Sequence, residues 1–296
     1  MYRLALLALL LVPAPPLRFA APPELAAVQR KLESAYGNDP KRFNDIAQLV
    51  GLTDPGPPIQ IVLAPETAAV AREVPLWVAG FASSGSSMVV VFPARSPGYP
   101  NGTLEDVLRH EVAHVLIGRA SDGRPIPRWF NEGLAMSVER GWRIQDEGQF
   151  VYQLAIGSRT SLEDLNRMFE GGQTDQIRAY AFAGALVHDL LQRSGPLTGA
   201  VILSRMNNGA SFENAFTEAV GMTPADAESE FWKRQRMWAT WLPILTSPTT
   251  LWLAITALAL LAIARRIMRN RAIERKWAEE GMDEVVDRED PPPPVN

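Results

Sequence analysis

The sequence predicts an α+β fold in which a small mixed sheet is followed by a mainly helical half, with one C-terminal transmembrane helix. Two short β-branched runs, 59–63 and 88–92, have the composition of strands and lie in the first third of the chain. From residue 103 onward, apolar residues recur at helical spacing behind capping residues. Residues 243–264 carry no charge, and about 20 apolar residues suffice to span a bilayer.

The composition narrows the classes of protein. The 296 residues are 47 % hydrophobic and 21 % charged, as in ordinary globular chains, and the net charge of −4 argues against a nucleic-acid partner. The chain has no cysteine, which excludes disulfides and cysteine-ligated metals. It has only three histidines. Any bound metal must therefore be held by His, Asp and Glu.

The first 21 residues predict a secretion signal peptide. Arg3 gives this segment a positive start, and residues 4–12 form an apolar run that is too short to cross a hydrocarbon core of about 30 Å. Residues 22–54 then predict an N-terminal helical segment, because they contain two helical stripes that each end at a glycine.

Residues 55–240 form the main predicted domain. Between its two strands lies the glycine- and serine-rich stretch 80–87, which predicts a loop or a hairpin tip. Capping residues or prolines introduce several of the helices that follow. The expected helices cover 103–117, 127–140, a segment from 161, 180–192, 212–220 and 224–238.

The C-terminal part predicts a single membrane span over 243–265. Tryptophans lie near one end of the span, and a cluster of arginines follows the other, which predicts a cytoplasmic C-terminus. The alternative is a buried core helix, although such helices seldom run so long without a polar face. Residues 266–296 predict a charged, disordered cytoplasmic tail. Signal and span together place residues 22–240 outside the cytoplasm, in a periplasmic or extracellular location.

The motif that carries chemistry is H-E-x-x-H at residues 110–114. His110 and His114 are four residues apart, so on a helix both imidazoles project from one face and can reach one Zn²⁺. Glu111 lies about 100° round the helix, where it can reach a water molecule on the metal without acting as a ligand. This arrangement predicts metal-assisted hydrolysis. The alternative is two exposed histidines on a surface helix.

A catalytic zinc site needs a third protein ligand, and the sequence offers Glu132. Seventeen residues separate it from His114, and its neighbours Trp129 and Phe130 predict that its surroundings are buried. A buried carboxylate needs a compensating partner, which a metal ion would supply. The alternative is a solvated surface carboxylate. Glu139, seven residues further on, lies on a similar helical face and is the fallback ligand.

The motif H-E-V-A-H followed by W-F-N-E-G-L-A at 129–135 resembles the gluzincins of the thermolysin and M1 aminopeptidase clan. It is most similar to the peptidase MA-like domains of bacterial membrane and secreted proteins, over residues 55–240. The resemblance implies an active-site helix with His110, His114 and Glu132 as zinc ligands and Glu111 as the general base. It also implies that the strand 88–92 is the edge strand that holds an extended substrate.

The resemblance further implies a donor that stabilises the oxyanion. Tyr180 is favoured because related enzymes use a tyrosine in this downstream region, and His188 on the same predicted helix is the other candidate. Each has a plainer alternative, Tyr180 as a core residue and His188 as a helix-surface residue. No G-x-M-E-N segment precedes the motif helix, so aminopeptidase specificity is not expected.

The predicted function is a membrane-anchored zinc metallopeptidase that cleaves a peptide or protein substrate outside the cytoplasm. The alternative is a non-catalytic, zinc-containing peptide-binding or scaffold module of the same fold, which would have no use for Glu111 as a base. A zinc-free interaction protein would require both motif segments to be accidental. The sequence leaves the substrate and the oligomeric state open.

Overall fold

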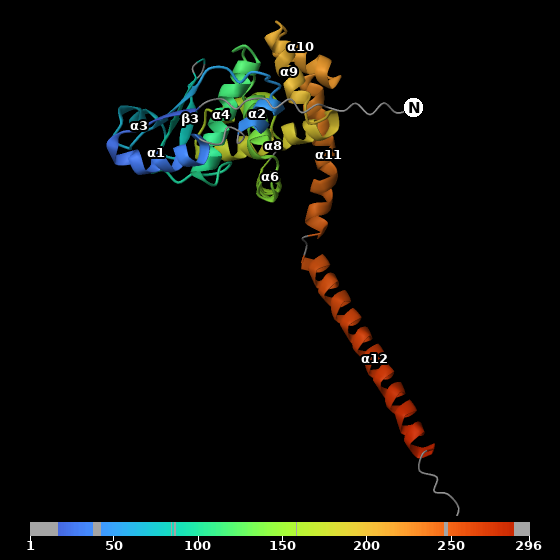
Figure 1. Cartoon of the computed structure of the whole chain (residues 1–296). Coiled ribbons are helices and arrows are strands. Elements are labelled where there is room, and N and C mark those ends of the chain that lie inside the picture. The colour runs from blue at the N-terminus through green and yellow to red at the C-terminus, as the bar shows by residue number, and fades with distance from the viewer. Residues whose placement is uncertain are drawn as a thin grey trace, which may run out of the picture. The chain divides into compact units, whose positions relative to one another are not determined.

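The computed structural model describes residues 17–37, 43–83, 85, 87–157, 159–245 and 248–286 (Figure 1). The chain divides into two compact units, Met1–Arg234 and Gln235–Asn296. The first unit holds the sheet and the packed helices. The second holds the end of one helix and a long C-terminal helix.

A four-stranded mixed sheet lies in the first unit, within the part of the chain that the structure describes. Its strands are β1 Leu17–Ala20, β2 Ile59–Leu63, β3 Gly80–Ala82 and β4 Met88–Val91. The order across the sheet is β1-β2-β4-β3, with β1, β2 and β4 parallel and β3 antiparallel to β4. Ile59, Ile61 and Leu63 are buried because alternate side chains of β2 face the core.

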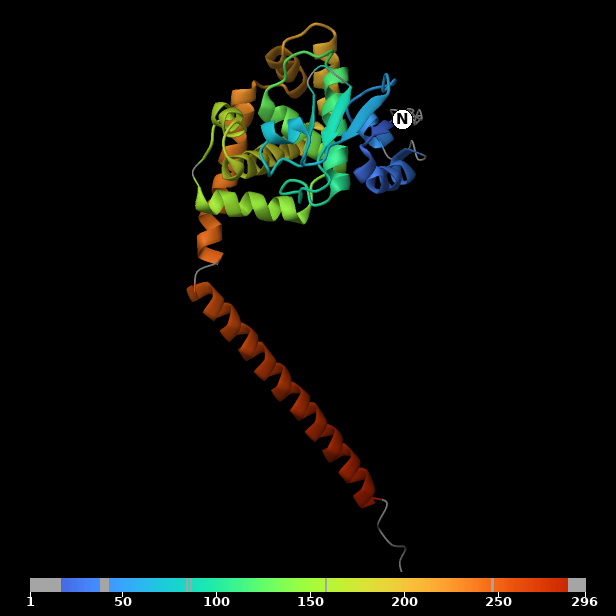
Figure 2. The same cartoon turned by 90° about the vertical axis from the view of Figure 1, so that its left-hand side faces the viewer.

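The other regular elements of the described chain are helices, in the first unit and in the second. They are α1 Ala26–Leu32, α2 Asn44–Leu49, α3 Ala69–Glu73, α4 Leu104–Ala120, α5 Arg128–Arg140, α6 Ile144–Ile156, α7 Leu162–Met168, α8 Gln173–Ser194, α9 Thr198–Asn207, α10 Phe212–Val220, α11 Pro224–Leu245 and α12 Pro248–Val286. A short 3₁₀-helix at Pro23–Leu25 precedes α1, and a short π-helix at Glu33–Gly37 follows it. Figure 2 shows the strands lying alongside α4, which packs on the other side against α5.

The close packing of α5 against α8 depends on a glycine. A Cβ atom at Gly133 would lie 2.5 Å from the carbonyl oxygen of Ala183 and 2.6 Å from a methyl of Val187. The two backbones can approach this closely only because residue 133 has no side chain. The glycine that follows Glu132 therefore has a packing role, and it fixes the turn of α5 on which that carboxylate sits.

The observed α+β arrangement, a small mixed sheet followed mainly by helices, is the one that the sequence predicts. The structure differs at the N-terminus, because β1 lies inside the segment 1–21 that we predicted as a signal peptide. Residues 17–20 pair with β2 and belong to the folded sheet. Four residues are too few to show a strand pattern beside a longer apolar run. The rest of that prediction, residues 1–16, lies outside the described residues.

The prediction of a transmembrane helix over 243–265 is wrong. Those residues do not form one helix, because α11 ends at Leu245 and α12 begins at Pro248. In α12 the uncharged stretch ends at Ala264, and its 17 residues rise only about 26 Å, less than a hydrocarbon core of about 30 Å. No helix among the described residues is long and apolar enough to cross a membrane. The predicted single-pass anchor, and the localisation built on it, are not supported.

Candidate metal centre

The helix that carries the H-E-x-x-H motif begins at a capping box. The Thr103 hydroxyl accepts a hydrogen bond from the backbone N–H of Asp106 at 3.1 Å, and the Asp106 carboxylate accepts one from the N–H of Thr103 at 3.1 Å. This reciprocal pair satisfies two of the free N–H groups at the start of α4 and fixes where the helix begins. His110 and Glu111 are thereby placed on a buried turn, 2 % and 7 % exposed.

Three side chains from α4 and α5 converge on one point. The Nε2 atoms of His110 and His114 are 3.2 Å apart, and Oε2 of Glu132 lies 3.3 Å from the first and 3.2 Å from the second. Zinc–ligand distances of about 2.0–2.1 Å in a tetrahedral site put neighbouring ligand atoms about 3.3 Å apart. The spacing of these three atoms therefore fits a tetrahedral metal ion, and the residues form a group able to hold one.

The opposite ring nitrogens of both histidines are held by oxygen atoms. Nδ1 of His110 lies 2.7 Å from Oε2 of Glu139, and Nδ1 of His114 lies 3.1 Å from Oδ1 of Asn131. An imidazole that donates its Nδ1–H in this way presents the Nε2 lone pair to a metal. Three lone-pair acceptors this close together repel one another unless a cation or a proton lies between them. The donor set thus has the chemistry of a metal site.

Glu139 has a different place from the one that we allowed for it as a fallback ligand. Its carboxylate lies behind His110 rather than in the cluster, and its other oxygen, Oε1, accepts a hydrogen bond from Nε of Arg140 at 2.8 Å. The side chain is fully buried. Glu139 therefore orients His110, and Arg140 balances its charge.

Burial and charge act against each other at the cluster in the metal-free chain. Burial alone would lower the pKa of His110, but the carboxylates of Glu139 and Glu132 outweigh it and raise that pKa well above its ordinary value. The pKa of His114 is raised in the same way, against burial, by Glu132. Burial would raise the pKa of Glu132, but the two imidazoles hold it well below its usual range. The cluster is a strongly coupled set of charges.

Glu111 lies next to the cluster, between it and strand β3. Burial raises the pKa of Glu111, the imidazoles of His114 and His110 oppose this rise, and Glu132 adds to it. The backbone N–H of Ala82 in β3 donates a hydrogen bond to the carboxylate. A carboxylate whose pKa is raised in a buried site is a better proton acceptor than one in water.

The strand beside Glu111 is not the one that we predicted. The prediction made the strand 88–92 the edge strand, but β4 lies between β2 and β3, and the edge is β3. β3 has only three residues and lies inside the stretch that predicts a loop or a hairpin tip. Its outer backbone groups are the ones available to an added extended chain.

Comparison with known proteins assigns the family. A model of the peptidase MA superfamily matches residues 74–238, which is more than half of the chain. The chain belongs to the peptidase MA superfamily. No curated protein and no solved structure matches it. The finer likeness to thermolysin and the M1 aminopeptidases stays a prediction.

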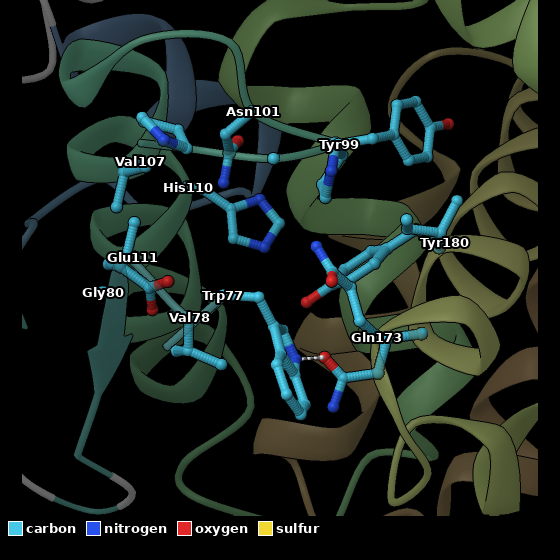
Figure 3. Close-up of a pocket in the computed structure, with 16 residues that line it drawn as sticks. Trp77, Val78, Gly80, Tyr99, Asn101, Val107, His110, Glu111, Gln173 and Tyr180 are labelled. Atoms are coloured by element: carbon cyan, nitrogen blue, oxygen red, sulfur yellow. Dashed lines mark hydrogen bonds between the residues drawn. The ribbon is translucent and has the colours of Figure 1, made fainter. Parts of the chain in front are cut away.

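Within the peptidase MA region, Tyr180 lies beside the motif. It lines one pocket together with His110 and Glu111 (Figure 3), and its ring centre is 6.2 Å from that of His110. Burial raises the pKa of the Tyr180 hydroxyl well above its ordinary value, and the carboxylates of Glu132 and Glu111 add to the rise. The hydroxyl therefore keeps its proton and can donate it in a hydrogen bond.

His188, the other candidate donor, does not line this pocket. Its ring stacks on that of Trp142, with the centres 4.9 Å apart and the planes 9° from parallel. Burial lowers the pKa of His188, against the raising effect of Glu147 and Asp189. The structure thus brings Tyr180, and not His188, to the motif.

Some residues of the peptidase MA site were missed from the sequence. Asn131 adjoins the candidate ligand Glu132, but nothing in its position alone shows that it faces His114. Trp77 and Gln176 line the pocket from segments 99 residues apart, and no local pattern links them. Among the residues that hold the ligands in place, only Glu139 could be noticed in the sequence. It lies seven residues after Glu132, on a similar face of the same helix.

Proposed function

We propose that the chain is a zinc-dependent peptidase that hydrolyses peptide bonds in a peptide or protein substrate. The observation that carries the proposal is the convergence of His110, His114 and Glu132 at the spacing of a tetrahedral site, with Glu111 beside them. Membership of the peptidase MA superfamily suggests the activity class. Histidine nitrogens and a carboxylate oxygen are ligands that zinc accepts.

His110, His114 and Glu132 would hold the ion, which supplies Lewis acidity that polarises a carbonyl and makes water more acidic. Glu111 takes a proton from the attacking water and passes it to the leaving nitrogen. The Tyr180 hydroxyl donates a hydrogen bond to the carbonyl oxygen as negative charge develops there. The free edge of β3 binds the extended substrate beside Glu111.

The alternative function is a non-catalytic, zinc-containing binding or scaffold module. It would keep the metal, but Glu111 would have no chemical role in it. The position of Glu111 argues against it, because this carboxylate is buried next to the cluster without belonging to it. A structural zinc site closes its fourth position with a protein ligand. Among the described residues, the group able to hold a metal contributes three.

The proposal is tested by measuring the zinc content and the peptide cleavage of the same sample of the full chain. We expect the wild-type protein to retain about one zinc per chain after dialysis and to cleave members of a quenched-fluorescent peptide mixture. Glu111→Gln should keep the zinc and lose about 10²–10⁴-fold in cleavage rate, the range typical of a lost general base.

Glu105→Gln is the matched control, because it removes an exposed carboxylate from the same helix. It should change neither the zinc content nor the rate. A Glu111→Gln protein that cleaves peptides at the wild-type rate contradicts the proposed mechanism. Wild-type protein that holds zinc but cleaves nothing in the mixture favours the non-catalytic module.

A further inference from the structure

A small hollow lies beside Glu111 and adjoins the ligand cluster through His110. His110 and Glu111 line it, but His114 and Glu132 do not. Its volume is about 70 Å³. Figure 3 shows Glu111 and Val107 on one side of this space and Gln173 and Tyr180 on the other. A side chain that enters it must therefore belong to a residue next to the bond on which Glu111 acts.

The walls of the hollow select by size and charge. A closed cavity of about 150 Å³ can hold a benzene ring, so a hollow of about 70 Å³ is small for an aromatic side chain and fits a smaller one better. Glu111 is the single carboxylate in the lining, and no lysine or arginine contributes to it. Apart from His110, the other polar groups there include the neutral amides of Asn101 and Gln173. These walls suit a small, uncharged side chain.

Trp77 closes the hollow on one side. Its indole Nε1 donates a hydrogen bond at 3.2 Å to Oε1 of Gln176 on α8, which joins the segment before β3 to the helical half (Figure 3). Gln176 is itself held, because its Nε2 donates to the carbonyl oxygens of Phe169 at 3.2 Å and Gly171 at 3.4 Å. The indole is 36 % exposed, and this bond holds it against α8 at the rim of the hollow.

A buried arginine holds the backbone on either side of Trp77. Nη1 of Arg95 donates to the carbonyl oxygens of Pro75 at 2.9 Å and Val78 at 2.8 Å, and Nη2 donates to that of Ala71 at 2.9 Å. The guanidinium also pairs with Glu66 at 2.9 Å and lies 3.9 Å from the centre of the Phe92 ring. The backbone on both sides of Trp77 is therefore anchored to a buried charge.

We propose that this hollow is a specificity pocket for a small, uncharged side chain beside the scissile bond, and that Trp77 is the residue that limits its size. The proposal rests on the proposed peptidase function. Trp77 acts here by shape: it touches the substrate side chain that enters the pocket and excludes larger ones.

The test measures the binding of peptide hydroxamates to the zinc-loaded full chain by calorimetry. The hydroxamate group binds the metal, and the adjacent side chain is that of Ala, Leu, Phe or Lys. We expect the wild type to bind the Ala compound at least about tenfold more tightly than the Phe compound, the discrimination typical of a pocket that is too small. Trp77→Ala should bring the two within about threefold of each other.

Two further variants allow the pocket to be tested without relying on Trp77→Ala alone. Leu76→Ala is the matched control: it truncates the exposed neighbour of Trp77, which does not line the pocket, and it should keep the wild-type ratio. Ile177→Ala widens the pocket from α8 and should strengthen binding of the Phe compound at least about threefold, even if Trp77→Ala does not fold.

The outcomes separate this inference from the proposed function. A wild type that binds the Phe and Ala compounds equally, or a folded Trp77→Ala protein that keeps the wild-type ratio, overturns the pocket and leaves the zinc peptidase standing. An unchanged ratio in Ile177→Ala also counts against the pocket. A wild type that holds no zinc, or that binds none of the hydroxamates, overturns both.

Discussion

The pocket next to Glu111 has two walls that are built in different ways. The wall formed by α4 carries His110 and Glu111. The ligand cluster behind it joins α4 to α5 through residues no more than 22 positions apart in the sequence. The wall formed by β3 and the segment before it has no titratable side chain in the pocket lining and is held by Arg95 and by the bond from Trp77 to α8. The first wall supplies reactive groups, and the second supplies shape.

Because of this difference, we expect substitutions in the two walls to affect different properties of the protein. A change behind α4 should weaken the metal site and leave the fold nearly intact. A change behind β3 should weaken the fold around the pocket and leave the metal site nearly intact. Two substitutions test this separation, and a third tests the start of α4.

The largest effect on the metal site is expected behind His110. Glu139→Gln keeps the size of the side chain but removes the charge that orients the imidazole, which is hydrogen-bonded at 2.7 Å. Loss of such a partner typically weakens metal binding about 10–100-fold. Competition with a fluorescent zinc chelator would measure the affinity.

The matched control for this experiment is Glu105→Gln, an exposed carboxylate at the start of the same helix as His110. Its zinc affinity should equal that of the wild type. If Glu139→Gln binds zinc as tightly as the control does, then Glu139 has no orienting role and the helical wall does not depend on it.

The next effect concerns the strand wall. Arg95→Met leaves the carbonyl oxygens of Ala71, Pro75 and Val78 without their donor, and we expect the free energy of unfolding to fall by about 3 kcal/mol. Zinc affinity should stay within about twofold of the wild type, because no ligand changes. Urea unfolding and the same chelator competition would measure the two quantities.

Arg72→Met serves as the comparison, because Arg72 is exposed on α3 close to the same segment. A surface substitution of this kind should change stability by no more than about 0.5 kcal/mol. Should Arg95→Met lose zinc affinity as strongly as Glu139→Gln, the two walls are coupled and the separation between them is wrong.

The contrast between the walls also explains what the sequence could predict. The capping box at Thr103 and the four-residue spacing of the histidines are local, so α4 and its buried face could be placed correctly. The approach of Glu132 to those histidines could be predicted from its motif. That these residues bind zinc stays a prediction.

Other features could not be predicted because they depend on distant partners. β3 has three residues, and it is a strand only because β4 lies next to it, so its sequence alone indicated a loop or a hairpin tip. β1 likewise needs β2, 42 positions away in register. The predicted span failed for a related reason: an uncharged run of 22 residues does not reveal that one helix ends at Leu245 and the next begins at Pro248.

The smallest effect is expected at the start of α4, where Asp106 closes the capping box. Burial would raise the pKa of Asp106, but hydrogen bonds from Thr103 and Gly102 and the charge of Arg143 lower it below its ordinary value of 3.8. A lowered pKa stabilises the fold above pH 3.8, and this stabilisation is lost as the pH falls through the folded-state value. We expect Asp106→Asn to cost about 1 kcal/mol at pH 7.

The pH dependence distinguishes the cap from a general charge effect. Urea unfolding of wild type and Asp106→Asn should give a difference that is constant from pH 7 down to about pH 5 and then shrinks as the carboxylate is protonated. Glu105→Gln removes an exposed charge from the same helical turn, and it should cost less than Asp106→Asn at pH 7 because Glu105 makes no capping bond. A difference that persists undiminished at pH 2.5 would mean that the shape of the side chain, and not its charge, holds the start of the helix that positions His110 and His114.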